Sequence, residues 1–156
     1  MRLTTLEKVL HLRRVPLFSE MSGRELRQIA EIAAQESFPA QHLIFREGDP
    51  GSKLYLVVDG EVEIFLERQG ARTLLAKVQP GAFFGEMSIF DLEPRSASAA
   101  SVGPLTCLTL SCRAFRDLVF TFPAVVFPVL QHISRNLRKA NEAEVRARQN
   151  AAPSSS

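Results

Sequence analysis

The sequence predicts an α+β fold in which an antiparallel β jelly roll follows N-terminal helices and precedes C-terminal helices. Two observations support this prediction. Apolar residues recur at helical spacing up to about residue 36, alternate in short runs after that, and return to helical spacing beyond residue 111. The middle part holds about seven or eight such runs, which is typical of a sandwich or jelly roll.

The N-terminal part is predicted to hold two helices. Apolar residues at helical spacing indicate a first helix over residues 3–13: Leu3, Leu6, Val9, Leu10 and Leu12. Pro16 interrupts this pattern, and either Ser19 or Ser22 is suited to cap a second helix near residues 22–35. One face of that second helix is apolar through Leu26, Ile29, Ile32 and Ala33.

Short strands are expected in the middle part of the chain. Their positions are Ser37–Phe38, Leu43–Phe45, Leu54–Val58, Val62–Leu66, Thr73–Val78, Ala97–Val102 and Leu105–Leu110. The pair Asp59-Gly60 predicts a hairpin between the third and fourth of these runs. The fourth run alternates, so that Val62, Ile64 and Leu66 should face the core, while the residues between them, Phe65 included, should face solvent.

The stretch Pro80–Ser98 does not read as an ordinary piece of core. Its glycines allow the backbone to come close to a ligand, and residues 85–90 read as one helical turn whose first amides suit an anion. The stretch adds a guanidinium, from Arg95, and the hydroxyls of Ser96 and Ser98. These groups together predict a phosphate site.

One carboxylate, Glu86, lies in the same stretch. A carboxylate does not serve a phosphate, but it accepts hydrogen bonds from a sugar hydroxyl, so the combination predicts a nucleotide. Two plainer interpretations remain open from the residues alone. Arg95 would be a surface ion-pair partner of Glu93 or Asp91, and Glu86 would only complement the dipole of the helical turn.

The C-terminal part returns to helix, first over Arg113–Phe120 and then from Pro123 to about residue 147. Pro128 should bend the second helix or displace its start. Apolar residues in this helix repeat at 4-3-4-3 spacing: Val126, Leu130, Ile133, Leu137 and Ala140. This pattern fits a coiled-coil seam or a helix packed on its own domain, and the second interpretation is favoured because the repeat covers only about two heptads.

Two segments resemble a known family. Phe84-Gly85-Glu86-Met87-Ser88-Ile89, followed by Pro94-Arg95-Ser96-Ala97-Ser98, resembles the phosphate-binding cassette of cyclic nucleotide-binding domains. Such domains occur in protein kinase A regulatory subunits, cyclic-nucleotide-gated channels and bacterial catabolite activator proteins. The resemblance runs from about Val15 to Arg138, and it implies a jelly roll whose C-terminal helix acts as a lid.

The resemblance also implies roles for single residues. The implied contacts to a cyclic nucleotide are Phe84, Gly85, Glu86, Met87, Ser88, Arg95, Ser96 and Ala97. Glu86 would bind the ribose 2′-hydroxyl, Arg95 the phosphate, and Ile89 would be the family's hydrophobic hinge. Phe83 and Phe84 are assigned to the core rather than to base stacking. The lid over the base would come from Leu130, Leu137 or Arg138.

The implied ligand is cAMP or cGMP. Bacterial relatives with serine after the arginine often bind cAMP, and Ser96 stands at that position here, so cAMP is favoured. No other cofactor is implied.

The chain reads as one domain over residues 1–148: helices 1–36, roll 37–111 with its cassette 84–98, helices 112–148, and then a disordered tail 149–156. A net charge of +2 gives no reason to expect nucleic acid as a partner. No run approaches the about 18 apolar residues of a membrane span. Cys107 and Cys112 read as reduced packing residues of a cytoplasmic protein.

No catalytic or metal-binding motif stands out, because the histidines His11, His42 and His132 are scattered. We therefore expect a regulatory domain rather than an enzyme. It would sense a cyclic nucleotide, shift its C-terminal helix and signal to an unknown effector protein, with a homodimer through that helix as a further possibility. No DNA-binding domain is expected after the roll. The alternatives are a degenerate fold that acts as a ligand-free protein-interaction module, and a jelly-roll enzyme, which the missing metal-ligand cluster disfavours.

Overall fold

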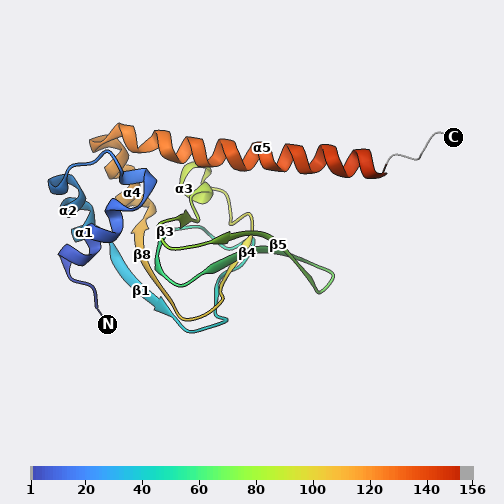
Figure 1. Ribbon diagram of the computed structural model, residues 1–156, viewed down its shortest axis with the longest axis horizontal. Coiled ribbons are helices and arrows are strands. Elements are labelled where there is room, and N and C mark those ends of the chain that lie inside the picture. The colour runs from blue at the N-terminus through green and yellow to red at the C-terminus, as the bar shows by residue number, and fades with distance from the viewer. Residues whose placement is uncertain (1, 152–156) are drawn as a thin grey trace.

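The computed structural model describes residues 2–151 and shows a roll of two sheets with helices on one side and above it (Figure 1). Its helical elements are α1 (Thr5–Arg13), η1 (Pro16–Phe18), α2 (Gly23–Ile32), α3 (Met87–Asp91), α4 (Cys112–Thr121), η2 (Pro123–Val125) and α5 (Val126–Ala151). Its strands are β1 (Ala34–Phe38), β2 (Leu43–Phe45), β3 (Lys53–Asp59), β4 (Val62–Arg68), β5 (Ala71–Val78), β6 (Phe83–Phe84), β7 (Ser98–Ser101) and β8 (Leu105–Ser111). The expected α+β jelly roll is confirmed.

The first two helices begin where their sequences supply caps. Thr4 and Glu7 form a capping box at α1, in which each side chain accepts a hydrogen bond from the other residue's backbone N–H at 3.2 Å. Ser22, rather than Ser19, caps α2 by accepting from the backbone N–H of Glu25. Both helices therefore start at residues whose side chains satisfy amides that the helix leaves unpaired.

The predicted end of the second helix is wrong by about one turn. α2 ends at Ile32 and β1 already begins at Ala34, so the boundary between the helices and the roll lies before residue 36. Ile32 is exposed, contrary to its place on the predicted apolar face, whereas Leu26 and Ile29 are buried as expected. The β1 residues pair with β8, and this sheet pairing ends the helix.

Two antiparallel four-stranded sheets form the roll, in the orders β1-β8-β3-β6 and β2-β7-β4-β5. The predicted hairpin at Asp59-Gly60 is wrong, because β3 and β4 lie in different sheets and the chain crosses between the sheets at this turn. Gly60 has a φ of 102°, and a Cβ there would lie 2.5 Å from the carbonyl oxygen of Pro104. Gly60 thus allows the chain to turn sharply from one sheet to the other where there is no room for a side chain.

The first sheet is packed on both faces. Leu54 and Leu56 of β3 face the helices, together with Leu108 and Leu110 of β8. The alternate residues of the same strands, such as Tyr55 and Val57, face the interior of the roll and meet Val62, Ala99 and other residues of the second sheet. The fold therefore has helices, one sheet, the roll interior and the second sheet in succession, and the cassette lies between β6 and β7 at one end of the roll.

Strand β4 alternates as predicted, with one exception in exposure. Val62 and Ile64 pack into the roll interior, and Glu63 and Glu67 lie on the outer face. Phe65 shares that outer face but is only 1% exposed, since the guanidinium of Arg72 on β5 lies 3.8 Å above its ring. The ring of Phe65 is therefore shielded from solvent on the outer face, because the side chain of Arg72 covers it.

The long helix α5 packs on the domain only through its first turns. Pro128 lies in its first turn, which confirms that the proline displaces the start of the regular helix. Val125 and Val129 are buried, but every residue from Ser134 to Ala151 is exposed, and Leu137 is 61% exposed. The favoured interpretation, a helix packed on its own domain, is therefore wrong for the second half of α5, which extends beyond the roll (Figure 1).

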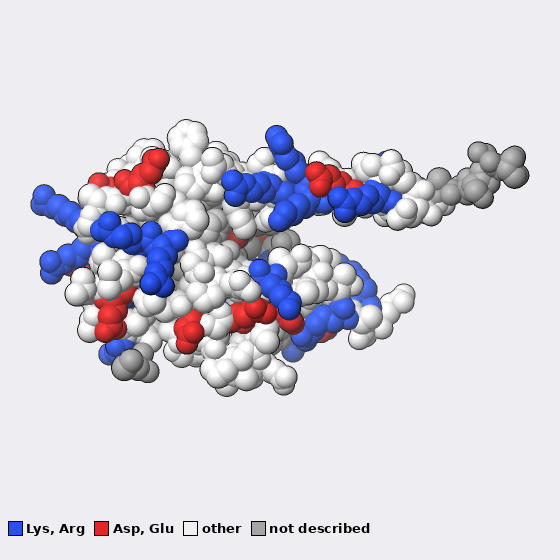
Figure 2. All heavy atoms as spheres, in the orientation of Figure 1, with Lys and Arg blue, Asp and Glu red and all other residues white. Residues whose placement is uncertain are grey.

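Helix α5 continues to Ala151, so residues 149–151 of the predicted tail are helical, and the rest of that tail lies outside the described residues. On the visible face, basic and acidic side chains both line α5 (Figure 2). Two of the acidic ones pair with arginines one turn on, Glu142 with Arg146 and Glu144 with Arg148. Across residues 2–151, no helix is both long and apolar enough to cross a membrane.

Candidate cyclic nucleotide site

The predicted helical turn of the cassette is present as α3, between β6 and β7. Gly85 leads into it with a φ of 84°, and Leu92 ends it in a left-handed conformation with a φ of 59°. Residues 92–97 then return the chain to β7 without regular structure. The cassette is therefore a short helical turn held between two strands that belong to different sheets.

Arg95 is buried at the centre of this segment, at 5% exposure. Its Nη1 donates to the carbonyl oxygen of Gly85 at 2.7 Å, and its Nη2 donates to the carbonyl oxygen of Lys53 at 2.9 Å. The guanidinium carbon lies 4.2 Å from the ring centroid of Phe45. Among the described residues Arg95 forms no ion pair with Glu93 or Asp91, so its interpretation as a surface ion-pair partner is wrong.

The third nitrogen of this guanidinium has no partner. Nε of Arg95 is the one buried side-chain nitrogen or oxygen, within the described part of the chain, that lacks a hydrogen bond. Burial lowers the pKa of Arg95, while Tyr55, Glu86 and Asp49 act in the opposite direction. A buried cation with an unpaired donor and no carboxylate in contact is suited to receive an anion.

Two glycines allow the chain to close around Arg95. A Cβ on Gly85 would lie 2.7 Å from Nη1 of Arg95. A Cβ on Gly51 would lie 2.1 Å from Cβ of Ser88 and 3.3 Å from the guanidinium carbon of Arg95. Nothing near Gly51 in the sequence indicates this contact, which joins segments far apart in the chain.

The loop that contains Gly51 also holds the backbone of Arg95. The N–H of Gly48 donates to the carbonyl oxygen of Arg95, and the N–H of Arg95 donates to the carbonyl oxygen of Asp49, both at 2.8 Å. Asp49 in turn accepts from the N–H of Arg46. These bonds fix the position of Arg95 from the second side, opposite to its contacts with Gly85 and Lys53.

Glu86 is also buried, at 7% exposure, and it lies at the N-cap of α3 without making a side-chain cap. Its Oε1 lies 3.2 Å from Nε2 of His132 on α5. The ring of His132 lies 4.7 Å from the ring of Phe83. Sequence reasoning missed His132, because its 46-residue separation from Glu86 and its position on a helix gave no local signal.

The residues expected to form the lid do not cover the cassette in this structure. Leu130, Leu137 and Arg138 are all exposed. His132, which lies on a different face of α5, makes the contact with Glu86. The role of the three exposed residues over a bound base stays a prediction.

The other predicted site residues differ in their surroundings. Phe84 is buried and stacks on Tyr55 with centroids 4.9 Å apart, which confirms its assignment to the core. Ser88, Ile89 and Ala97 are buried, and Ile89 belongs to the helix-side core. Two predicted contacts are exposed and meet each other, since Ser96 Oγ lies 3.7 Å from Sδ of Met87.

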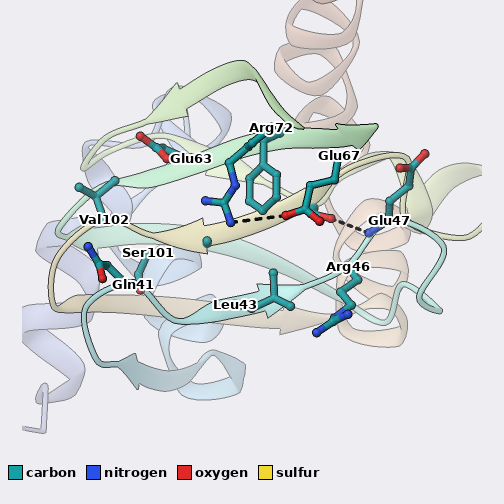
Figure 3. A pocket seen from close by; sticks show the side chains of 12 residues that line it. Gln41, Leu43, Arg46, Glu47, Glu63, Glu67, Arg72, Ser101 and Val102 are labelled. Atoms are coloured by element: carbon teal, nitrogen blue, oxygen red, sulfur yellow. Dashed lines mark hydrogen bonds and ion pairs between the residues drawn. The ribbon is translucent and has the colours of Figure 1, made fainter. Parts of the chain in front are cut away.

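Ser98 does not belong to the anion site. Its hydroxyl accepts a hydrogen bond from the N–H of Glu47 at 2.9 Å, on the outer face of the second sheet. That face carries a hollow of about 730 Å³, which Figure 3 shows together with the ion pair between Arg72 and Glu67. Four of the five charged residues that line the hollow are exposed and Glu63 is partly buried, and neither Arg95 nor Glu86 is among the lining residues.

No group of three or more His, Cys, Asp or Glu side chains within residues 2–151 is placed to hold a metal ion. Cys107 and Cys112 are not joined by a disulfide. The groups that this site offers are a buried guanidinium, the backbone around α3, and one buried carboxylate.

Comparisons with known proteins agree on one family. The family model described as cyclic nucleotide-binding domain matches residues 35–122. A CRP-like cAMP-activated global transcriptional regulator of Mycobacterium tuberculosis is 30% identical over 131 residues, which cover 83% of this chain and 58% of that protein. The cyclic AMP receptor protein of Thermus thermophilus is 34% identical over 127 residues, which cover 81% of this chain and 59% of that protein.

Solved structures support the same fold. The catabolite activator protein of Thermus thermophilus matches with a TM-score of 0.77 and 33% identity, covering 85% of this chain and 63% of that one. The chain thus spans less than two thirds of each of these three relatives. By name they are regulatory or binding proteins.

Proposed function

The chain belongs to the cyclic nucleotide-binding domain family, and from this premise we propose that it binds cAMP, in preference to cGMP, as a regulatory domain. The observation that carries the proposal is the buried guanidinium of Arg95, whose Nε has no partner. A cyclic phosphate bears one negative charge and has acceptor oxygens, so it would supply both the counter-charge and the missing acceptor.

The phosphate would lie against Arg95 and the backbone at the start of α3. Each hydrogen bond to a charged group contributes roughly 1.5–3 kcal/mol net, which is more than a bond between two neutral groups contributes. Gly85, Met87, Ser88, Ser96 and Ala97 would supply the remaining backbone and hydroxyl contacts. The two carbonyls that already hold Arg95 fix the orientation of its guanidinium before the ligand arrives, which limits the entropy lost on binding.

The ribose would lie against Glu86. A carboxylate is an acceptor only, and a sugar hydroxyl is a donor, so Glu86 would accept from the 2′-hydroxyl. Phe84 would contribute shape rather than stacking, since its ring already stacks on Tyr55. The ribose and phosphate groups would therefore be bound by two different residues, Glu86 and Arg95, at opposite ends of the cassette.

Ligand binding would be transmitted through α5. Ile89 lies in the core cluster that also contains Val125 and Val129, so a movement of α3 would reach the base of α5 through packed side chains. Binding would then shift the balance between two positions of α5, limited by the ligand's different affinity for the two. This movement and the role of Ile89 as its hinge are part of the proposal.

The signal would pass to an effector protein or to a second copy of the chain. The exposed apolar side chains of α5, among them Leu130, Leu137 and Val145, support a role in such contacts. We further propose that residues 1–148 act as one ligand-binding unit, without enzymatic activity, in the cytoplasm.

Calorimetric titration of purified protein, freed of co-purified nucleotide, would test this function. We expect micromolar or tighter binding of cAMP, weaker binding of cGMP, and much weaker binding of 5′-AMP, which carries a second negative charge and lacks the ring. Absence of binding to both cyclic nucleotides, in protein that melts cooperatively, would contradict the proposal and favour a ligand-free interaction module.

A further inference from the structure

One residue of α5, His132, joins the helix to the cassette. Its Nε2 lies 3.2 Å from Oε1 of Glu86, and its ring lies 4.7 Å from the ring of Phe83 on β6. Neither contact was expected from the sequence. His132 is therefore the side chain of α5 that meets the buried carboxylate of the candidate site.

We propose that His132 is a positioning residue for the ribose end of the site. It holds one oxygen of Glu86 and leaves the other oxygen to accept from the 2′-hydroxyl of the ligand. This inference rests on the proposed function, and it adds to it a residue on α5 that affects affinity only for ligands with that hydroxyl.

The two groups lie at the distance of an ion pair. Because a carboxylate only accepts, the contact is attractive when Nε2 of His132 carries a hydrogen. Glu86 forms no other ion pair or side-chain hydrogen bond among the described residues, and it does not cap α3 with its side chain. His132 is thus the group that sets the orientation of this carboxylate.

The imidazole itself is held from two sides. The ring of Phe83 packs against it, and Nδ2 of Asn136, one turn further along α5, lies 3.2 Å from the same Nε2. An Nε2 with a free lone pair accepts from the amide of Asn136, whereas an Nε2 that bears hydrogen is attracted to Oε1 of Glu86. The two neighbours therefore favour different forms of the His132 ring.

Fixing the carboxylate matters for a small ligand. A glutamate side chain free to rotate must be immobilised when a ribose binds, and that cost lowers the affinity. With Oε1 already held by His132, the other oxygen would be presented in one direction. The benefit would be felt by a ligand with a 2′-hydroxyl and not by one without it.

Titrations of cAMP and 2′-deoxy-cAMP test this inference. The variants are His132→Ala, His132→Gln and Gln131→Ala, compared with the wild-type protein. We expect His132→Ala to weaken cAMP binding about five- to tenfold and to change 2′-deoxy-cAMP binding less than about twofold. His132→Gln should retain most of the affinity for cAMP, since its amide N–H can donate to Oε1. Gln131→Ala, at an exposed neighbouring residue of α5, should bind both nucleotides like the wild type.

Three other results would contradict the proposed role of His132. Equal weakening of both nucleotides by His132→Ala, at unchanged thermal stability, would overturn the inference, because His132 would then act on α5 and not on the ribose. Unchanged cAMP affinity in that variant would overturn it as well, while leaving the proposed function intact. Binding of neither nucleotide by the wild-type protein would remove the proposed function and this inference together.

Discussion

Arg95 and Gly85 form a close backbone-to-side-chain pair, in which Nη1 of Arg95 donates to the carbonyl oxygen of Gly85 at 2.7 Å. The same glycine has a φ of 84° and leaves no room for a Cβ, which would lie 2.7 Å from that nitrogen. The position of the guanidinium thus depends on the absence of a side chain at residue 85. A substitution at residue 85 would therefore have two costs, the strain of a positive φ and the overlap of the new methyl group with Arg95. Comparison with a glycine that has a positive φ but open space around it measures the two costs separately.

Substitution Gly85→Ala should weaken cAMP binding at least tenfold, equivalent to about 1.4 kcal/mol, because the added methyl group displaces the guanidinium of Arg95. It should also lower the free energy of unfolding by more than the roughly 1–2 kcal/mol that a left-handed backbone costs an alanine. Urea denaturation and calorimetric titration measure the two effects.

The matched control for Gly85 is Gly70→Ala. Gly70 has a φ of 77°, but no atom lies within 4 Å of the place that an added methyl group would occupy, so only the backbone cost applies there. This variant should lose about 1–2 kcal/mol of stability and bind cAMP within about twofold of the wild type. Equal effects of the two substitutions on binding would show that the Gly85 contact with Arg95 is unimportant.

The contact between Gly51 and the cassette can be tested by Gly51→Ala. Its methyl group would overlap Cβ of Ser88, so the loop and α3 must move apart, at a cost of about 1–3 kcal/mol in the free energy of unfolding. Gly103→Ala, where no atom lies within 4 Å, should change it by less than about 0.5 kcal/mol. Urea denaturation of both variants provides the comparison, and equal stabilities would contradict the close packing of loop and cassette.

Helix α5 should contribute to stability only through its first turns. Val129→Ala removes a side chain that is fully buried in the helix-side core, and we expect a loss of about 1–3 kcal/mol in the free energy of unfolding. Leu137→Ala removes an exposed side chain and should leave the stability of a monomer nearly unchanged. A concentration-dependent loss of thermal stability in Leu137→Ala would instead indicate that α5 is covered by a second copy.

The two cysteines should differ in reactivity. Burial raises the pKa of the Cys107 thiol to about 12, so in mildly alkaline buffer it is almost wholly protonated and shielded inside the roll. Cys112 is only partly buried, and its Sγ lies 3.8 Å from the carbonyl oxygen of Ile89. Iodoacetamide should therefore modify Cys112 first, and peptide mass spectrometry should find Cys107 modified only after denaturation. Early modification of Cys107 would mean that the roll opens readily.

Local signals in the sequence were enough to predict most of the fold. Helical and alternating periods predicted the order of helices and strands. The turn at Gln69-Gly70 joins two paired strands, β4 and β5. The turn at Asp59-Gly60 looks similar in sequence, but it joins strands of different sheets. The two cases differ in long-range packing, since Gly60 is crowded by Pro104 and Gly70 has open space around it.

The site could be predicted only in part, because some of its contacts are also made by residues far apart in the sequence. Gly85, Glu86 and Arg95 are close together in the chain, so their chemistry could be recognised as a unit. Gly51 and His132 meet that unit from distant parts of the chain, and nothing near them in sequence indicates these contacts. The exposed second half of α5 was also missed, because an apolar repeat looks the same whether its partner is this domain or another surface.

The role of Arg95 is tested most directly by comparing the cAMP affinity of the wild-type protein with that of Arg95→Ala, measured by calorimetry. Thermal unfolding should first establish that the variant is folded, because Arg95 also holds the carbonyl groups of Gly85 and Lys53. We predict micromolar or tighter binding by the wild type and at least tenfold weaker binding by the variant, equivalent to about 1.4 kcal/mol. Wild-type affinity in a folded Arg95→Ala variant would contradict the assignment of this residue to the phosphate.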